Sequence, residues 1–203
     1  MSDGDSVSDD ELARAAQAIR DGNLVVYPTE TVYGLGAAAL DADAVERVFE
    51  AKGRSRDKPV SLGVPTVDDA LDHVRATDRE ERFMREFLPG PVTVLCERRE
   101  HVPDVLVAGR DRVGIRVADH PVALDLCRAA ETPVTATSAN ISGRPSVTDP
   151  ADLDDELLDS VAVVLDAGEA AGTESTVVNV STGEIHRRGT MADRIENWLA
   201  TES

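Results

Sequence analysis

The sequence predicts one α/β domain with a mixed β-sheet, and three observations support that prediction. Segments of strand composition and segments of helical spacing interleave irregularly, which favours a mixed sheet over a regular alternation. The 203 residues suit a single domain, and no repeat, low-complexity tract or linker divides them. Hydrophobic residues make up 41% of the chain but aromatic residues only 3%. The core should therefore consist mainly of Val, Leu, Ile and Ala.

The first elements are defined by their ends. Ser8 and Glu11 form a capping-box pattern that should open a helix over 9–21, with Gly22 ending it. A short apolar run then predicts a buried strand over 24–27. We expect the domain to span residues 9–200, after an acidic, flexible extension over residues 1–8.

The following segments alternate between turns and regular elements. Residues 28–37 contain glycines and predict a turn region, and Gly53 suits the C-terminal cap of a helix over 41–51. Thr182 and Gly183 should form a hairpin turn. The other predicted elements are strands over 59–64, 91–96, 112–117, 133–137, 161–165, 175–180 and 184–187, and helices over 67–75, 78–87, 121–130, 151–159 and 191–200.

The overall charge restricts the possible partners. A net charge of −18 argues against nonspecific attraction to nucleic acid or to anionic membranes. No apolar run approaches the roughly 20 residues that span a bilayer, and the acidic N-terminus does not resemble a targeting signal. Cys96 and Cys127 lack metal-ligand spacing, so we expect buried, reduced thiols and a cytoplasmic location. An acidic surface with few lysines further suggests a protein from a halophile.

One loop concentrates positive charge. Lys52, Arg54, Arg56 and Lys58 lie within seven residues, and the chain has no other lysine. Lysine and arginine are standard phosphate ligands, so we predict an anion site here. The alternative is a solvated loop, which is what most charged runs are. No Walker motif is present, so the phosphates would be held in another way.

Small polar residues follow or begin several predicted strands. They occur over 28–36, 135–144 and 174–176, where hydroxyl and backbone N–H groups can bind a carboxylate or phosphate. Each segment read alone is equally compatible with ordinary turn chemistry. Arg116 within a strand needs a polar pocket or an exposed edge. No nucleophile with an adjacent base and no histidine metal spacing is present, so catalysis should depend on positioning and charge neutralisation.

Taken together, these segments resemble a known family. YPTETVYGLGA, KGRSRDKP, LPGPVTVL, VGIRV, TSANISGRPS, ESTVVNVS and HRRG resemble, in order and spacing, the YrdC family of L-threonylcarbamoyladenylate synthases. The resemblance covers residues 23–189, and the chain resembles the short form that lacks an extra C-terminal domain.

The resemblance implies a fold and a reaction. The fold would be a twisted mixed sheet flanked by helices, with a deep cationic cavity. L-threonine, bicarbonate and ATP would condense to threonylcarbamoyl-adenylate and pyrophosphate. A partner transferase complex would then modify the adenosine next to the anticodon of tRNA. Mg²⁺ is expected to enter with ATP, held mainly by phosphate oxygens and water.

The resemblance also implies roles for residues. Thr29, Arg116 and Ser175 would contact L-threonine, with Arg116 binding its carboxylate. Lys52, Arg54 and Arg56 would be the catalytic cations. The implied ATP contacts are Lys52, Arg56, Ser138, Asn140, Ser146 and Arg187. No residue is expected to form a metal site of the protein's own.

Two departures from the family pattern are visible. Gly63 stands where many members have a histidine, and Arg188 replaces the usual proline before Gly189. Three other functions stay open: an RNA-binding module, a related adenylating or carbamoylating enzyme with another substrate, and a purely structural subunit of the tRNA-modification machinery. The charge of −18 disfavours the first.

Overall fold

The computed structural model describes residues 7–201, so residues 1–6 of the predicted N-terminal extension lie outside the described part. The helices are α1 (Asp9–Arg20), α2 (Ala42–Lys52), α3 (Val67–Leu71), α4 (Asp78–Phe87), α5 (Asp104–Val107), α6 (Pro121–Ala130), α7 (Asp155–Leu158) and α8 (Ala192–Thr201). The strands are β1 (Leu24–Tyr27), β2 (Gly34–Gly36), β3 (Ser61–Gly63), β4 (Val74–Arg75), β5 (Val92–Arg98), β6 (Arg112–Arg116), β7 (Val134–Ser138), β8 (Val161–Val164), β9 (Thr176–Asn179) and β10 (Glu184–Arg187).

Within the described residues these strands form one mixed sheet. Its order is β10-β9-β5-β6-β3-β7-β2-β1-β8, and β4 pairs with β5. The pairs β1–β8, β3–β6 and β5–β9 are parallel, and the remaining pairs are antiparallel. The predicted α/β class with a mixed sheet is therefore confirmed.

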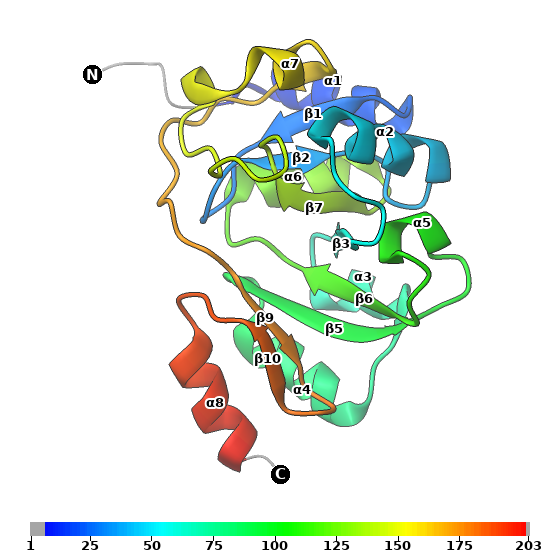
Figure 1. Cartoon of the computed structure of the whole chain (residues 1–203), viewed down its shortest axis with the longest axis vertical. Coiled ribbons are helices and arrows are strands. Elements are labelled where there is room, and N and C mark those ends of the chain that lie inside the picture. The colour runs from blue at the N-terminus through cyan, green and yellow to red at the C-terminus, as the bar shows by residue number, and fades with distance from the viewer. Residues whose placement is uncertain (1–6, 202–203) are drawn as a thin grey trace.

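Helices pack on the sheet around two hydrophobic clusters. In the first, Ile19 of α1 and Leu126 of α6 pack with Val25 and Leu35. In the second, Phe83 of α4 packs with strands β3, β5 and β6. Figure 1 shows α8 at the end of the molecule opposite α1 and α7. There Trp198 meets Phe83 edge to face, with ring centroids 4.9 Å apart.

Several local predictions are confirmed. Ser8 with Glu11 and Thr77 with Glu80 form complete capping boxes at the starts of α1 and α4. Gly53 caps α2 in the left-handed conformation with φ 55°. The β9–β10 hairpin turns through Gly183 at φ 72°. Local chemistry at helix ends and turns was therefore sufficient to locate these boundaries.

The structure corrects other predictions. Part of the expected turn over 28–37 is strand β2, which pairs with both β1 and β7. Its glycines are required by packing, because a Cβ on Gly34 would lie 2.8 Å from the ring of Tyr27. Sheet pairing thus overrode the turn propensity of the glycines.

Two predicted helices are shorter than expected. The helix over 67–75 ends at Leu71, and β4 then pairs with β5. The helix over 151–159 divides into a 3₁₀ turn, Pro150–Asp152, and α7. Helix α5 was not predicted, because four residues carry too little periodicity. None of the helices in the described part is long and apolar enough to cross a membrane.

Candidate functional site

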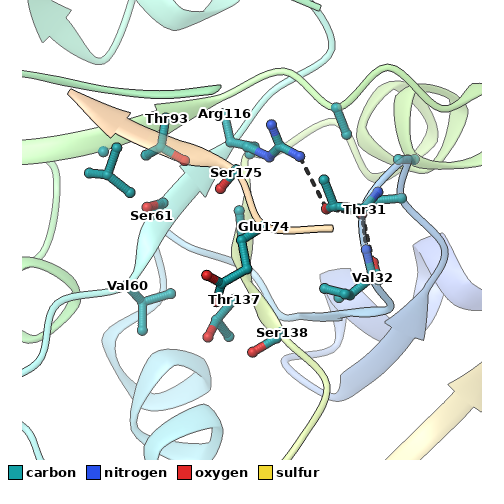
Figure 2. Close-up of a pocket in the computed structure, with 18 of the residues that line it drawn as sticks. Thr31, Val32, Val60, Ser61, Thr93, Arg116, Thr137, Ser138, Glu174 and Ser175 are labelled. Carbon is teal, nitrogen blue, oxygen red and sulfur yellow. Dashed lines mark hydrogen bonds between the residues drawn. The ribbon is translucent and has the colours of Figure 1, made fainter. Parts of the chain in front are cut away.

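A cavity of about 360 Å³ opens between the centre of the sheet and two loops. Its walls come from the β1–β2 loop, from strands β3, β5, β6 and β7, and from the segment that enters β9. Figure 2 shows hydroxyl groups of Ser61, Thr93, Thr137 and Ser175 around this space. The structure therefore gathers polar side chains from distant parts of the chain into one site.

The lining of the cavity holds more basic than acidic side chains. Five arginines line it, and Glu174 is the one acidic lining residue among the described residues. The arginines are Arg54, Arg110, Arg112, Arg116 and Arg187. Arg112 and Arg116 are paired with Glu80 and Glu30. Arg54, Arg110 and Arg187 are therefore the lining arginines whose charge can attract an anion.

Arg116 lies in the wall of the cavity, at the end of β6. Its Nη1 donates to the carbonyls of Gly90 and Val92, and its Nη2 donates to Glu30 Oε1 at 2.8 Å and to Thr31 Oγ1 at 3.4 Å. Figure 2 shows the contact with Thr31. Burial lowers the pKa of Arg116, and the nearby Glu30 carboxylate opposes that shift. The guanidinium is thus rigidly held with one edge toward the cavity.

Thr29 organises the β1–β2 loop beside Arg116. Its Oγ1 donates to the carbonyl of Val32 at 2.6 Å and accepts from the N–H groups of Thr31 and Val32. The hydroxyls of Thr29 and Thr31 are 2.9 Å apart. Both residues are buried and line the cavity, so the loop presents two linked hydroxyls to it.

Ser175 and Arg187 form another part of the cavity wall. Arg187 donates from Nη2 to Ser175 Oγ at 2.6 Å and from Nε to the carbonyl of Ser175 at 2.9 Å. Gly189 allows this approach, since a Cβ there would lie 2.2 Å from the carbonyl oxygen of Glu174. Burial lowers the pKa of Arg54, and the charge of Arg187 contributes, so these two arginines share one region of the cavity.

Lys52 is enclosed instead of facing the cavity. Its side chain is 1% exposed, and Nζ donates to the carbonyls of Ser138 and Asn140, the latter at 2.7 Å. Burial, with a smaller contribution from Arg54, lowers the pKa of Lys52 to about 7. The Asn140 amide donates to the carbonyls of Ile141 and Arg144. Lys52 and Asn140 therefore shape the turn that carries Ser138, which does line the cavity.

The remaining cations of the loop point elsewhere. Arg56 is 57% exposed and pairs with Glu46 at 2.6 Å. Lys58 is exposed and does not line the cavity. Of the four clustered cations, the structure brings only Arg54 to the lining, where it joins Ser138 and Ser146.

Sequence reasoning missed some lining residues. Arg112, Gly114 and Arg116 occupy alternate positions of β6 and all face the cavity. This period of two was legible in RVGIR and could have identified Arg112. A Cβ on Gly114 would lie 2.5 Å from Ser61 Oγ, so this glycine keeps the cavity open. Arg110 lies in a loop and carried no comparable signal.

The protein itself offers little to a metal ion. In the part of the chain that the structure describes, no three His, Cys, Asp or Glu side chains are grouped to hold one. His73 and His101 approach to 2.9 Å, but as a pair. Cys96 and Cys127 are buried free thiols.

Comparisons with known proteins place the chain in a family. A threonylcarbamoyl-AMP synthase from Pyrococcus abyssi is 41% identical over 169 residues, covering 82% of this chain and 50% of that protein. One from Klebsiella pneumoniae is 30% identical over 181 residues, covering 88% of this chain and 95% of that protein. The crystal structure of P. abyssi Sua5 complexed with L-threonine superimposes with a TM-score of 0.83 at 40% identity, covering 88% of this chain and 54% of that one.

The extent of these matches differs. The chain spans about half the length of the P. abyssi and Bacillus subtilis relatives, 50% and 51% respectively. A family described as telomere recombination, Sua5/YciO/YrdC, matches residues 17–189. This agrees with the motifs found in the sequence. The chain belongs to the Sua5/YciO/YrdC family.

Proposed function

We propose that this chain is a nucleotidyltransferase that condenses L-threonine, bicarbonate and ATP into threonylcarbamoyl-adenylate, with release of pyrophosphate. The observation that carries the proposal is a cavity lined by five arginines and several hydroxyls in a protein of net charge −18. Its relatives named threonylcarbamoyl-AMP synthase, and the Sua5 complex with L-threonine, support the choice of reaction.

The amino-acid half of the site consists of Thr29, Arg116 and Ser175. Arg116 binds the carboxylate, because a rigid guanidinium fork matches a carboxylate in shape and charge. Thr29 and Ser175 lie on either side with hydroxyls that can bind the amino acid's polar groups.

The nucleotide half of the site consists of Arg54, Arg187 and Ser146, together with the TSAN turn over residues 137–140. Arg54, Arg187, Ser138 and Ser146 line the cavity and contact ATP. Lys52 and Asn140 act by holding the turn that carries Ser138. The remaining predicted ATP ligand, Arg56, reaches the phosphates only after leaving Glu46, so its contribution needs a movement of the loop.

The chemistry follows from charge placement. The amine of threonine captures bicarbonate with loss of water, and the resulting carbamate oxygen attacks the α-phosphorus of ATP. The bond to the β-phosphate breaks, and the arginines stabilise the departing pyrophosphate. Mg²⁺ bound to ATP, held by phosphate oxygens and water, would supply neutralisation of phosphate charge.

The product would be used by other proteins. A transferase complex would pass the threonylcarbamoyl group to adenosine next to the anticodon of tRNA. The net charge of −18 argues that this chain does not itself hold the RNA. The same charge and the scarcity of lysine favour a cytoplasmic location in a halophile.

The test is pyrophosphate release in high salt with ATP, Mg²⁺, bicarbonate and each amino acid in turn. Release that depends on L-threonine supports the proposal. Release with another amino acid identifies a related enzyme instead, and no release with tRNA binding identifies an RNA-binding module. Arg54→Gln should lower the rate about 100-fold, the usual cost of losing one transition-state donor. The matched control is Arg194→Gln, whose arginine pairs with Glu86 on the surface.

A further inference from the structure

Arg116 and Glu30 form a buried ion pair at the edge of the cavity. Their charged groups are 2.8 Å apart, and their side chains are 9% and 16% exposed. A buried guanidinium without a counter-charge is strongly unfavourable. Glu30 therefore compensates the charge of Arg116 while no other anion is bound.

All four Nη hydrogens of Arg116 are already used in hydrogen bonds, so none is free for a second carboxylate. Both Nη1 hydrogens go to fixed backbone carbonyls, and both Nη2 hydrogens go to Glu30 and Thr31. Bidentate binding of a carboxylate needs two adjacent N–H groups of the guanidinium. Nη2 must therefore release a side-chain partner when a substrate carboxylate binds. Two carboxylates against one guanidinium also repel each other, which favours departure of Glu30.

His120 is a candidate second partner for the Glu30 carboxylate. Glu30 Oε2 and His120 Nδ1 are both buried, and neither has a hydrogen-bond partner. Burial lowers the pKa of His120, and the charge of Glu30 opposes this shift, so the two groups lie within electrostatic range. His120 also precedes the first turn of α6, where a negative charge is favoured. Each unsatisfied atom can therefore serve as the partner of the other.

We infer that Glu30 is a placeholder carboxylate, which neutralises Arg116 until the amino acid binds. When the substrate carboxylate binds to Arg116, the Glu30 carboxylate leaves the guanidinium and moves toward His120. The inference rests on the proposed amino-acid half of the site. It makes Glu30 a positioning residue that acts through Arg116. Substrate binding then has to overcome the Arg116–Glu30 contact, which weakens the affinity for any carboxylate ligand.

The experiment is calorimetric titration of the whole protein and of Glu30→Gln with L-threonine and with L-threoninamide, which lacks the carboxylate. Glu30→Gln keeps the side-chain shape but removes the competing charge. We expect the variant to bind L-threonine about fivefold more tightly or better, because more of the protein has a free Arg116 fork. L-threoninamide should gain no affinity. If Glu30 had a purely structural role, the variant would bind L-threonine and L-threoninamide more weakly by a similar factor.

The matched control is Glu86→Gln, which removes an exposed carboxylate that pairs with Arg194 and does not line the cavity. It should change the affinity for L-threonine less than about twofold, because exposed charges are screened. If the unaltered protein binds L-threonine and Glu30→Gln binds it equally or less tightly, the inference is overturned and the proposed function stands. If the unaltered protein does not bind L-threonine, the proposed function fails as well.

A second measurement needs no variant. In a crystal structure of the unaltered protein with L-threonine, the Glu30 carboxylate should have left Arg116 and lie within hydrogen-bond distance of His120 Nδ1. An intact Arg116–Glu30 contact beside bound L-threonine would overturn the inference.

Discussion

At the scale of single residues, Lys52 shows how burial changes the role of a charged group. The end of α2 carries its amine into the protein, where it meets two backbone carbonyls. A neutral amine has two N–H groups, which matches two acceptors. Burial lowers its pKa to about 7, so the neutral form is accessible near neutral pH. The buried amine acts here as a structural link between α2 and the TSAN turn.

This link predicts a pH-dependent difference between the unaltered protein and Lys52→Met. The folded pKa of about 7 lies below the ordinary 10.5. Between these values the unfolded chain binds the additional proton, so the contribution of Lys52 to the free energy of unfolding rises with pH. Urea unfolding at several pH values should show the two proteins diverging from pH 7 to 10. Lys58→Met, which alters an exposed lysine, should show no such divergence, and a constant gap for Lys52→Met would contradict the prediction.

Residue roles were only partly predictable from the sequence. Arg116 stood out because an arginine inside a strand needs a polar partner, and the structure puts it in the cavity wall. Arg54 could not be separated from Arg56 by charge alone, because a run of cations does not state which side chain turns inward. That choice depends on Glu46, which is ten positions away and holds Arg56 outside.

At the scale of elements, Glu80 joins three parts of the fold. It completes the capping box of α4, and its Oε1 accepts from Arg112 of β6 at 2.9 Å and from Ser181 of the β9–β10 hairpin at 2.7 Å. Burial raises its pKa, but the hydrogen bonds from Thr77, Ser181 and Arg112 outweigh this and lower it. The carboxylate form therefore holds α4 against both strands.

This contact predicts an acid-sensitive stabilisation that Glu80→Gln removes. We expect the variant to lose about 1–3 kcal/mol of unfolding free energy at pH 7, the usual cost of a broken buried hydrogen-bond set. Because the folded pKa lies below the ordinary 4.5, the difference should be full above pH 4.5 and shrink as the pH falls below it. Thermal unfolding at pH 3 to 7 measures this. The control is Glu81→Gln at the half-buried neighbour, which pairs with Arg85 at the surface, and an equal loss there would exclude a special role for Glu80.

Element prediction succeeded where signals were local. Capping residues and apolar periodicity located the long helices and the central strands. Strands β2 and β4 were not predicted from the sequence, because each has at most three residues and forms by pairing with strands that are distant in the sequence. The cavity depends on those pairings, so its position in the fold came only with the structure.

At the scale of the whole molecule, the excess of negative charge dominates the electrostatics. The chain has 39 acidic and 21 basic residues, and many of the basic ones are committed to ion pairs or to the cavity. The negatively charged side chains on the outer surface therefore repel one another. In dilute buffer this repulsion acts over a Debye length of about 10 Å, which shrinks to about 3 Å at 1 M salt.

The stability of the folded protein should therefore increase with salt. We expect the melting temperature to rise continuously from 0.1 to 2 M KCl, because screening relieves repulsion in the compact state more than in the expanded one. Differential scanning calorimetry over that series is the measurement, with sucrose at matched osmolality as the control for solvent exclusion. A melting temperature that is constant or falls with KCl would reject both this prediction and the proposed halophilic origin.

The sheet order has a consequence for synthesis on the ribosome. Strands β8 and β9 are made late, yet β8 pairs with β1 at one edge and β9 inserts beside β5 near the other. A nascent chain that has not yet reached β9 lacks Ser175 and Arg187, so it can have a partly paired sheet but no complete cavity. Pairing over such long sequence separations is slow, because loop-closure entropy opposes it. A complete cavity thus forms only after β10 has been made, and a chain released before β8 lacks the parallel partners of β1 and β5.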